Sequence, residues 1–392
     1  MLSLLVRFLG LMVAVLLFSA CTAAAGSGAT SAPLLDSMVA SAGHTCGLDV
    51  TGGVWCWGQN QMGQLGSAAT QDSSSPVNVG DLGAGNRAIS TGPVHTCALV
   101  ASGQVRCWGG NAAGQLGSGT HVDSRAGVEA GSLPGISRAL AAGAEYTCVL
   151  NAVGGVLCWG SNAHGQLGVA AVDASDTPLD VTGLGSGLTA LSSGWYHTCA
   201  LTVAGGVKCW GDNQYGQLGN GTTTDSPLPV DVEGLNFGVR QISAGAGHTC
   251  ALTAVGAVKC WGQNQSGQLG NGSNQDSSTP QEVSGLSAGV REVSAGGDAS
   301  TGAAHTCAIT VSGGVVCWGS NLSGQLGDGT NTDSNIPVSV QGLTYGMRAV
   351  TAGGAHTCAL GATGSALCWG DNQYGQLGDG SQHSSPQPVT VK

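Results

Sequence analysis

The sequence predicts an all-β protein: a seven-bladed β-propeller of 51-residue repeats, with four strands per blade and a ring closed by the C-terminal strand. Fourteen of the 15 cysteines form seven pairs ten residues apart, and first cysteines recur every 51 residues except for one interval of 57. Each second cysteine opens Cys-Trp-Gly, and this glycine begins the sequence Gly-x-Asn-x-x-Gly-Gln-Leu-Gly. Short alternating strands separated by Gly and Asn turns, without helical periodicity, are typical of a propeller blade.

The composition is that of a folded protein without affinity for nucleic acid. Of the 392 residues, 42% are hydrophobic and nine are tryptophan, which is enough to bury a core. Only 8% are charged, with 22 acidic and 11 basic residues and a net charge of -11. Lys and Arg are scattered, whereas binding to phosphate backbones requires clustered cations. We therefore exclude nucleic acid as a partner.

Residues 1–21 are predicted to be a signal peptide with a lipobox-like end. The apolar run Phe8–Ala20 has 13 residues, fewer than the roughly 20 needed to span a bilayer. It ends in the sequence LFSAC, which resembles a bacterial lipobox, so we expect Cys21 to be lipidated. Ordinary cleavage near residues 23–25 is the alternative. Residues 22–35 would then be a flexible tether, and residues 36–392 the propeller.

Each cysteine pair brackets a predicted β-hairpin. In the first repeat the loop is Val50-Thr51-Gly52, and three-residue hairpin loops favour a glycine in the left-handed conformation. The third loop position is glycine in every repeat: Gly52, Gly103, Gly154, Gly205, Gly256, Gly313 and Gly364. Paired cysteines then face each other at a non-hydrogen-bonded position, where Cα atoms approach to about 4.5 Å and a disulfide can form.

We therefore predict seven disulfides rather than zinc sites, because a ten-residue spacing is not that of zinc ligands and no second pair completes a set of four. The predicted bridges join Cys46 with Cys56, Cys97 with Cys107, Cys148 with Cys158, Cys199 with Cys209, Cys250 with Cys260, Cys307 with Cys317, and Cys358 with Cys368. Disulfides indicate an oxidising compartment, which agrees with the leader.

The order of strands in each repeat predicts how the ring closes. After the hairpin, each repeat runs through a loop to a proline-containing strand and then to a strand such as 240–243. Residues 388–391 are the last copy of the proline strand, whereas Gly26-Ser27-Gly28 stands where the first repeat would need one. We therefore expect the C-terminal strand to complete the N-terminal blade, since a closed ring leaves few sheet edges exposed.

The repeat G-x-x-H-T-C-A-L-T-x-x-G-x-V-x-C-W-G-x-N-x-x-G-Q-L-G-x-G resembles that of the regulator of chromosome condensation family, over about 355 residues from Met38 to Lys392. The resemblance implies a seven-bladed propeller. From the nuclear eukaryotic members it implies guanine-nucleotide exchange on a small GTPase and chromatin binding. From secreted bacterial members it implies inhibition of β-lactamases through loops on one face. The leader, the paired cysteines and the acidic balance favour the exported bacterial type.

Polar residues that recur with the blades are predicted to be structural. Histidine precedes Thr-Cys in six repeats, and six equivalent copies favour a structural hydrogen bond over catalysis, which needs one histidine with a partner. These residues are His44, His95, His197, His248, His305 and His356, with Tyr146 in the third repeat. Aspartates in the D-S-x-x-P turns are expected to cap backbone amides. They are Asp72, Asp123, Asp225, Asp276 and Asp333. We predict no catalytic residue, no metal ligand and no cofactor.

Candidate binding residues are those that break the repeat. Trp195 and Tyr196 replace small residues before His197, and Trp and Tyr are enriched in binding hot spots. The other exceptions are Trp55 in a strand, Tyr215 and Tyr374 at one shared loop position, and Asp298 within six extra residues at 297–302. Our hypothesis is that these residues form one binding face.

The sequence thus predicts an exported, lipid-anchored, monomeric binding propeller without enzymatic activity. It would present loops to a protein or glycan at the cell surface, either as a lipoprotein of the bacterial cell envelope or as a secreted protein. One alternative is a regulator of a small GTPase resembling guanine-nucleotide exchange factors. Another is a polysaccharide-cleaving enzyme, for which Asp298 and His164 are the candidate acid-base residues.

Overall fold

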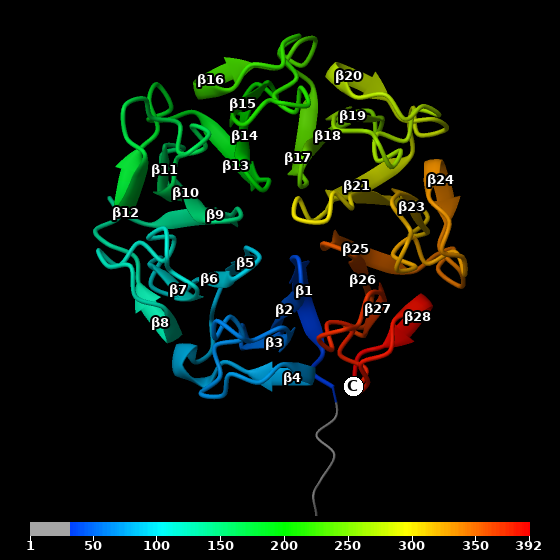
Figure 1. Cartoon of the computed structure of the whole chain (residues 1–392), viewed down its shortest axis with the longest axis horizontal. Coiled ribbons are helices and arrows are strands. Elements are labelled where there is room, and N and C mark those ends of the chain that lie inside the picture. Colours follow the sequence, from blue (N-terminus) through cyan, green and yellow to red (C-terminus); the bar gives the residue numbers. More distant parts are fainter. Residues whose placement is uncertain (1–31) are drawn as a thin grey trace, which may run out of the picture. The chain divides into compact units, whose positions relative to one another are not determined.

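The computed structural model describes residues 32–392, which form seven four-stranded antiparallel sheets arranged around a central axis (Figure 1). This confirms the predicted seven-bladed propeller. The predicted signal peptide, Cys21 and most of the predicted tether lie outside the described residues. The first strand begins at Leu35.

Each blade uses four consecutive strands, from the axis outward. The innermost strands are β1 (Leu35–Ala40), β5 (Ala88–Thr91), β9 (Ser137–Ala142), β13 (Leu188–Ser193), β17 (Val239–Ala244), β21 (Val290–Ala295) and β25 (Met347–Ala352). The second strands are β2 (His44–Asp49), β6 (His95–Leu99), β10 (Tyr146–Asn151), β14 (His197–Thr202), β18 (His248–Thr253), β22 (His305–Thr310) and β26 (His356–Gly361).

The third strands are β3 (Val54–Gly58), β7 (Val105–Gly109), β11 (Val156–Ser161), β15 (Val207–Gly211), β19 (Val258–Gly262), β23 (Val315–Gly319) and β27 (Ala366–Gly370). The outermost strands are β4 (Ser73–Asn78), β8 (Ser124–Glu129), β12 (Ala174–Asp180), β16 (Ser226–Asp231), β20 (Ser277–Glu282), β24 (Ser334–Ser339) and β28 (Ser385–Thr390). One 3-10 turn, η1 (Gly80–Leu82), follows β4. Six of the outermost strands contain proline, which an edge strand tolerates because its free side needs no backbone donor.

The hairpin between the second and third strands has the predicted loop and disulfide. Cys46 lies opposite Cys56, the two are bonded, and their Cα atoms are 4.1 Å apart. Gly52 has a φ of 78°, and its N–H donates to the carbonyl of Asp49 at 2.9 Å. The bridge therefore forms where the two strands approach each other most closely, as the loop length predicts.

All seven predicted disulfides are confirmed. The other six pairs are bonded in the same way as the first, with Cα separations of 4.0–4.1 Å: Cys97 with Cys107, Cys148 with Cys158, Cys199 with Cys209, Cys250 with Cys260, Cys307 with Cys317, and Cys358 with Cys368. Each bridge joins the second and third strands of one blade, and its cysteines are fully buried. The disulfides therefore brace individual blades and do not link one blade to the next.

The predicted mode of ring closure is wrong. Strand β28 pairs with β27 in its own blade, and β1 supplies the innermost strand of the first blade. The error lies in where the structural unit begins: each blade starts at its innermost strand, so the proline strand ends a blade instead of opening the next. Every blade is consequently a continuous stretch of chain, and within residues 32–392 no strand is exchanged across the seam.

The seam between the seventh and first blades is held like the other junctions, by side chains rather than by a shared sheet. Thr45 Oγ1 and His356 Nε2 are 2.8 Å apart, and the indole N–H of Trp57 donates to the carbonyl of Gln376 at 2.9 Å. Val391, beyond the end of β28, is buried against Leu35 and Trp57. The last residues therefore stabilise the seam by packing.

The same contacts repeat at all seven junctions and form what we call the inter-blade belt. A histidine Nε2, or the Tyr146 hydroxyl at one junction, lies 2.8–3.0 Å from a threonine Oγ1 of the next blade. Each of these threonines donates to the carbonyl of a Gly-Gln-Leu-Gly glutamine, and the same carbonyl accepts the indole N–H of a Cys-Trp-Gly tryptophan at 2.9 Å. These tryptophans are fully buried in hydrophobic clusters that join adjacent blades.

The belt histidines are neutral in the folded protein. Burial lowers the pKa of His44, His197, His248 and His305 to about 3, and that of His95 and His356 to about 4. Because the threonine proton goes to the glutamine carbonyl, the histidine Nε2 must donate to the threonine oxygen. The histidines therefore act as structural hydrogen-bond donors, as their repetition predicts.

Candidate binding face

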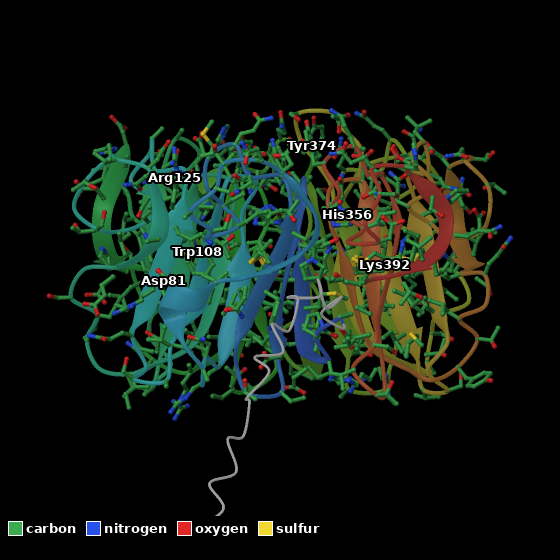
Figure 2. The ribbon with its side chains drawn as sticks, turned by 90° about the horizontal axis from the view of Figure 1, so that it is seen from below. Asp81, Trp108, Arg125, His356, Tyr374 and Lys392 are labelled. Atoms are coloured by element: carbon green, nitrogen blue, oxygen red, sulfur yellow. A yellow bond between two sulfur atoms is a disulfide. The ribbon has the colours of Figure 1, made fainter. Side chains whose placement is uncertain are left out.

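The two ends of the propeller are built from different loops. One end carries the loops between innermost and second strands together with the Gly-x-Asn-x-x-Gly-Gln-Leu-Gly loops, and we call it the Trp195 face. The other end carries the disulfide hairpin loops and the connections between blades, and we call it the hairpin face. Figure 2 shows Tyr374 near the upper edge of the ring, which is the Trp195 face. On the hairpin face, hairpin loops contact the connections between blades. For example, the Gly85 N–H donates to the Thr51 carbonyl at 2.8 Å.

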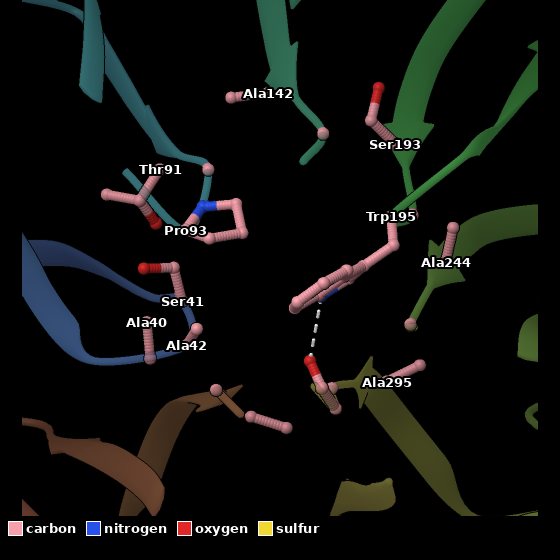
Figure 3. A pocket seen from close by; sticks show the side chains of 18 residues that line it. Ala40, Ser41, Ala42, Thr91, Pro93, Ala142, Ser193, Trp195, Ala244 and Ala295 are labelled. Carbon is pink, nitrogen blue, oxygen red and sulfur yellow. Dashed lines mark hydrogen bonds between the residues drawn. The ribbon is translucent and has the colours of Figure 1, made fainter. Parts of the chain in front are cut away.

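Trp195 lies across the end of the central channel on this face (Figure 3). The channel end holds a cavity of about 70 Å³ lined by residues from all seven blades, most of them Ala, Gly or Ser. At the position of Trp195 the other blades have Ala42, Pro93, Ala144, Ala246, Ala303 and Gly354. One large indole therefore fills space that six small residues leave open.

The six extra residues of the sixth blade meet this indole. The indole N–H of Trp195 donates to the Gly297 carbonyl at 3.1 Å, which joins the fourth blade to the sixth. The inserted loop is itself closed by a hydrogen bond from the Asp298 N–H to the Ala303 carbonyl at 2.8 Å, and the Asp298 carboxylate accepts the Ser300 N–H at 2.8 Å. Two separate irregularities of the repeat thus form one contact over the channel.

Two hollows adjoin Trp195, and together they contain all but one of the predicted binding residues. The smaller hollow, of about 220 Å³, is lined by Trp195, Tyr196 and Tyr215 among others. The larger, of about 500 Å³, is lined by Trp195, Asp298 and Tyr374. The Tyr215 ring packs on Gly247 of the next blade, and the Tyr374 ring packs on Gly43 in the same way. The rings lie so close to these glycines that a larger residue would clash with them. The structure therefore brings these five residues together on one face.

Trp55 does not lie with the others. It sits in β3 close to the hairpin face, where its indole N–H donates to a carboxylate oxygen of Asp49 at 2.9 Å. Burial alone would raise the pKa of Asp49, but hydrogen bonds from Thr51, Trp55 and Gly53 lower the pKa to about 2. Trp55 also packs against the cluster at the seam. These contacts give it a structural role in the first blade.

A cluster of polar side chains, His164, Asp212 and Asp225, lies beside Tyr196 at the junction of the third and fourth blades. The Tyr196 ring is 5.0 Å from the imidazole of His164 and 6.1 Å from the indole of Trp195. Burial, followed by the carboxylates of Glu145, Asp212 and Asp298, raises the pKa of Tyr196. His164, one of the two candidates for acid-base catalysis, faces Asp212 and Asp225 rather than Asp298.

The repeated aspartates cap backbone amides, as predicted. The carboxylates of Asp72, Asp123, Asp225, Asp276 and Asp333 each accept the N–H of the asparagine 12 residues earlier, at 2.7–2.8 Å. Ser384 takes this place in the last blade. Arginine also recurs with the blades, at Arg87, Arg138, Arg240, Arg291 and Arg348. Three of them, Arg240, Arg291 and Arg348, donate to a carbonyl of the following blade, which indicates a role in packing.

Sequence reasoning overlooked three residues that the structure singles out. Phe237 and Tyr345 occupy equivalent turns on the hairpin face and are 78% and 76% exposed. Asp212 is nearly buried next to His164. The signal for all three was the same comparison between repeats: other blades have Gln, Gly or Ser where Asp212 stands, except for Asp371, and small residues where Phe237 and Tyr345 stand.

Comparison with known proteins assigns the fold to a family. The sequence profile of the RCC1-like domain matches residues 29–301, and the regulator of chromosome condensation (RCC1) repeat matches residues 290–325, 347–376, 312–360 and 363–392. The chain belongs to the RCC1-like family. It is 34% identical to the Ultraviolet-B receptor UVR8 of Arabidopsis thaliana over 323 residues, which cover 79% of this chain and 70% of that receptor.

Other RCC1-like relatives share the propeller within different proteins. The human E3 ubiquitin-protein ligase HERC2 is 30% identical over 359 residues, but the match covers 87% of this chain and only 7% of the ligase. Human WBSCR16 and yeast RCC1 (Prp20), the latter solved bound to Kap60, superpose with TM-scores of 0.76 at 23% and 22% identity. The superposition with WBSCR16 covers 87% of this chain and 94% of WBSCR16, and that with Prp20 covers 86% of this chain and 83% of Prp20. Both structures show the same fold.

The disulfides of this RCC1-like chain bear on the compartment in which it folds. Its seven disulfides indicate an oxidising environment. Within residues 32–392, no helix has the length and hydrophobicity needed to cross a membrane.

Proposed function

We propose that this protein is an exported, lipid-anchored RCC1-like propeller of the bacterial cell envelope that binds a protein or glycan through its Trp195 face. The leader-like sequence at residues 1–21, with Cys21 as the lipidated residue, supports export and anchoring. The seven disulfides support folding outside the cytoplasm. The similarity to a receptor and to other propellers supports binding rather than catalysis.

One observation carries the assignment to this face: five of the six binding candidates chosen from the sequence line two adjoining hollows there, although Phe237 and Tyr345 depart from the repeat on the hairpin face. Six blades have a small residue at this position, whereas Trp195 of the fourth blade reaches across the channel end to Gly297 in the insertion of the sixth. Selection for a ligand on one face explains why five of the six exceptions meet at two adjoining hollows.

The chemistry of the hollows fits a polar ligand with some apolar surface. Tyrosine and tryptophan provide rigid contact area together with a hydroxyl or N–H group. The remaining lining includes amides such as Gln263 and Gln373 and the carboxylates of Asp212, Asp298 and Asp371, and no Lys or Arg of the described residues lines either hollow. Such a surface suits hydroxyl-rich glycans and weakly basic protein surfaces, and it disfavours polyanions.

The binding test compares the two faces of the same molecule. Replacing Trp195→Ala and Tyr196→Ala should weaken binding to envelope glycans or envelope proteins of the native host at least about tenfold, because both rigid aromatic contacts are lost. The matched control is Phe237→Ala with Tyr345→Ala, which removes two exposed aromatics from the hairpin face. Loss of binding in the control, with affinity unchanged in the first variant, would assign the function to the other end.

Export and anchoring are tested by the intact mass of the protein from its native host, measured without reduction after thiol alkylation. The expected mass begins at Cys21, carries acyl chains and shows no alkylated cysteine. A mass that begins at Met1 with alkylated cysteines would contradict the proposal, and the alternative of a cytoplasmic GTPase regulator would then be the better one.

A further inference from the structure

Three side chains with metal-binding atoms meet at the junction of the third and fourth blades. His164 comes from the loop after β11, and Asp212 and Asp225 come from the loop after β15. The Nδ1 atom of His164 lies 3.3 Å from Oδ2 of Asp225 and 4.0 Å from Oδ1 of Asp212. One ligand atom from each residue lies within 4.8 Å of the other two. The group is distinct from the channel end, although Asp212 also lines the smaller hollow.

Hydrogen bonds hold both carboxylates so that one oxygen of each faces His164. Asp225 accepts the Asn213 N–H with Oδ1, at 2.8 Å, and turns Oδ2 toward the imidazole. Asp212 accepts the side-chain amide of Gln217 with Oδ2, at 2.7 Å, whereas its Oδ1 faces the imidazole and also accepts the Gln214 N–H at 3.2 Å. Second hydrogen bonds of this kind are what orient carboxylate ligands at metal centres. The arrangement therefore exists before any ion is bound.

In the part of the chain that the structure describes, His164 alone pairs with the two carboxylates of the cluster. Among the described residues, no Lys or Arg forms a salt bridge with Asp212 or Asp225. The Asp212 side chain is only 6% exposed, so its charge is poorly solvated. Two carboxylates this close repel each other, and a divalent cation between them would offset that repulsion.

We propose that His164, Asp212 and Asp225 bind a zinc ion. Zinc bonds of about 2.0–2.2 Å in a tetrahedral site place neighbouring ligand atoms about 3.3–3.6 Å apart. The separation between His164 and Asp225 already meets this, and that between His164 and Asp212 needs a shift of about half an ångström. Imidazole with carboxylates is a donor set that zinc accepts, whereas magnesium and calcium prefer oxygen alone. Three protein ligands leave a fourth position for water or for a group of a bound partner.

The repeat provides an internal comparison that isolates the three ligands. The junction of the sixth and seventh blades has Ser323, Asp371 and Ser384 at the equivalent positions, so it retains one carboxylate alone. Asp371 keeps the same partner, since it accepts the side-chain amide of Gln376 at 2.7 Å. The second junction therefore has the same local fold without the donor set.

The test is isothermal titration of the untagged, oxidised full-length protein with zinc chloride. We expect one equivalent to bind, and we expect His164→Asn or Asp212→Asn to weaken the affinity at least about tenfold. The matched control, Asp371→Asn, should leave the affinity unchanged. Near-ultraviolet circular dichroism of each variant establishes that it is folded, and His164→Asn, on an exposed loop, provides a result even if Asp212→Asn does not fold.

Two further outcomes decide the proposal. Adding Ser323→His and Ser384→Asp to the wild-type chain should create a second zinc equivalent, because this rebuilds the three donors at the other junction. Zinc binding that survives His164→Asn unchanged would place the ion elsewhere, for example at the exposed His121 or His383, and would overturn the proposal. So would a wild-type protein that binds no zinc at micromolar concentrations.

Discussion

The inter-blade belt and the Trp195 face use the same residue type in opposite ways. In the belt, seven equivalent tryptophans are fully buried and each donates to a glutamine carbonyl of the neighbouring blade. On the face, a single tryptophan without equivalents donates to a carbonyl two blades away. The comparison teaches that repeated residues in this chain hold the blades together, whereas the departures from the repeat at Trp195 and its neighbours lie on the surface that we propose for a ligand.

The largest expected effect comes from reducing the disulfides that brace every blade. In the chain-entropy model, closing an 11-residue loop contributes about 2.5–3 kcal/mol per bridge, so losing all seven exceeds the stability of an ordinary domain. We expect dithiothreitol to unfold the protein at physiological temperature, measured by far-ultraviolet circular dichroism. A fully reduced protein that keeps its spectrum would show that the belt alone holds the ring.

The second largest effect is expected from acid, which should lower the free energy of unfolding by protonating the belt histidines. The six belt histidines have folded pKa values of about 3 or 4, below the value of about 6.5 in the unfolded chain, so the unfolded state binds more protons below about pH 6.5. The stability that these histidines contribute is therefore fully present above about pH 6.5 and is lost progressively as the pH falls through about 4 to about 3.

Urea denaturation at a series of pH values from about 7.5 down to about 4 measures this loss. Replacing a belt histidine, for example His248→Gln, should make the dependence on pH shallower, since one titrating group is removed. Midpoints that stay constant over the whole series would contradict the neutral, buried state of these side chains.

A single belt tryptophan should matter more than the tryptophan on the face. Trp261→Ala removes a fully buried indole and its hydrogen bond to Gln217, and we expect a loss of about 3–5 kcal/mol in the free energy of unfolding. Urea denaturation of the oxidised protein gives the value. A cost below about 1 kcal/mol would mean that blades can close over the missing side chain.

The smallest effect on stability is expected for the same change on the Trp195 face. Trp195→Ala removes a partly exposed side chain and one hydrogen bond, so we expect a loss of only about 1 kcal/mol. The same denaturation experiment checks it, and binding provides the contrast, because affinity should fall while the urea midpoint hardly moves. A loss as large as that for Trp261→Ala would show that the indole holds the ring together.

Local rules were enough to predict the blade. The ten-residue spacing of Cys46 and Cys56, with Gly52 at a position that needs a positive φ, determines a hairpin and its disulfide without knowledge of the rest of the chain. The closure was predicted wrongly because both assignments of the proline strand give four strands per blade. Only the pairing of β28 with β27 distinguishes them.

The sequence identified most residues of the Trp195 face but not the contacts between them. Trp195 and Asp298 stand out when the repeats are compared, but the contact of Trp195 with Gly297 over the channel depends on the path of a six-residue insertion. His164 and Asp212 come from different blades, so the distance between them depends on the rotation between neighbouring sheets, which no local spacing encodes.

Because each blade is one continuous stretch of chain, the ring has no privileged starting point. Its two ends lie at a seam whose hydrogen bonds and packing match those of the other six junctions. Circularly permuted versions that open at any connection between blades should therefore preserve every sheet, provided that a linker joins Lys392 to the start of the first blade. The same property means that tandem duplication of one repeat in the gene would add a complete blade, so the width of the ring can evolve separately from the design of each blade.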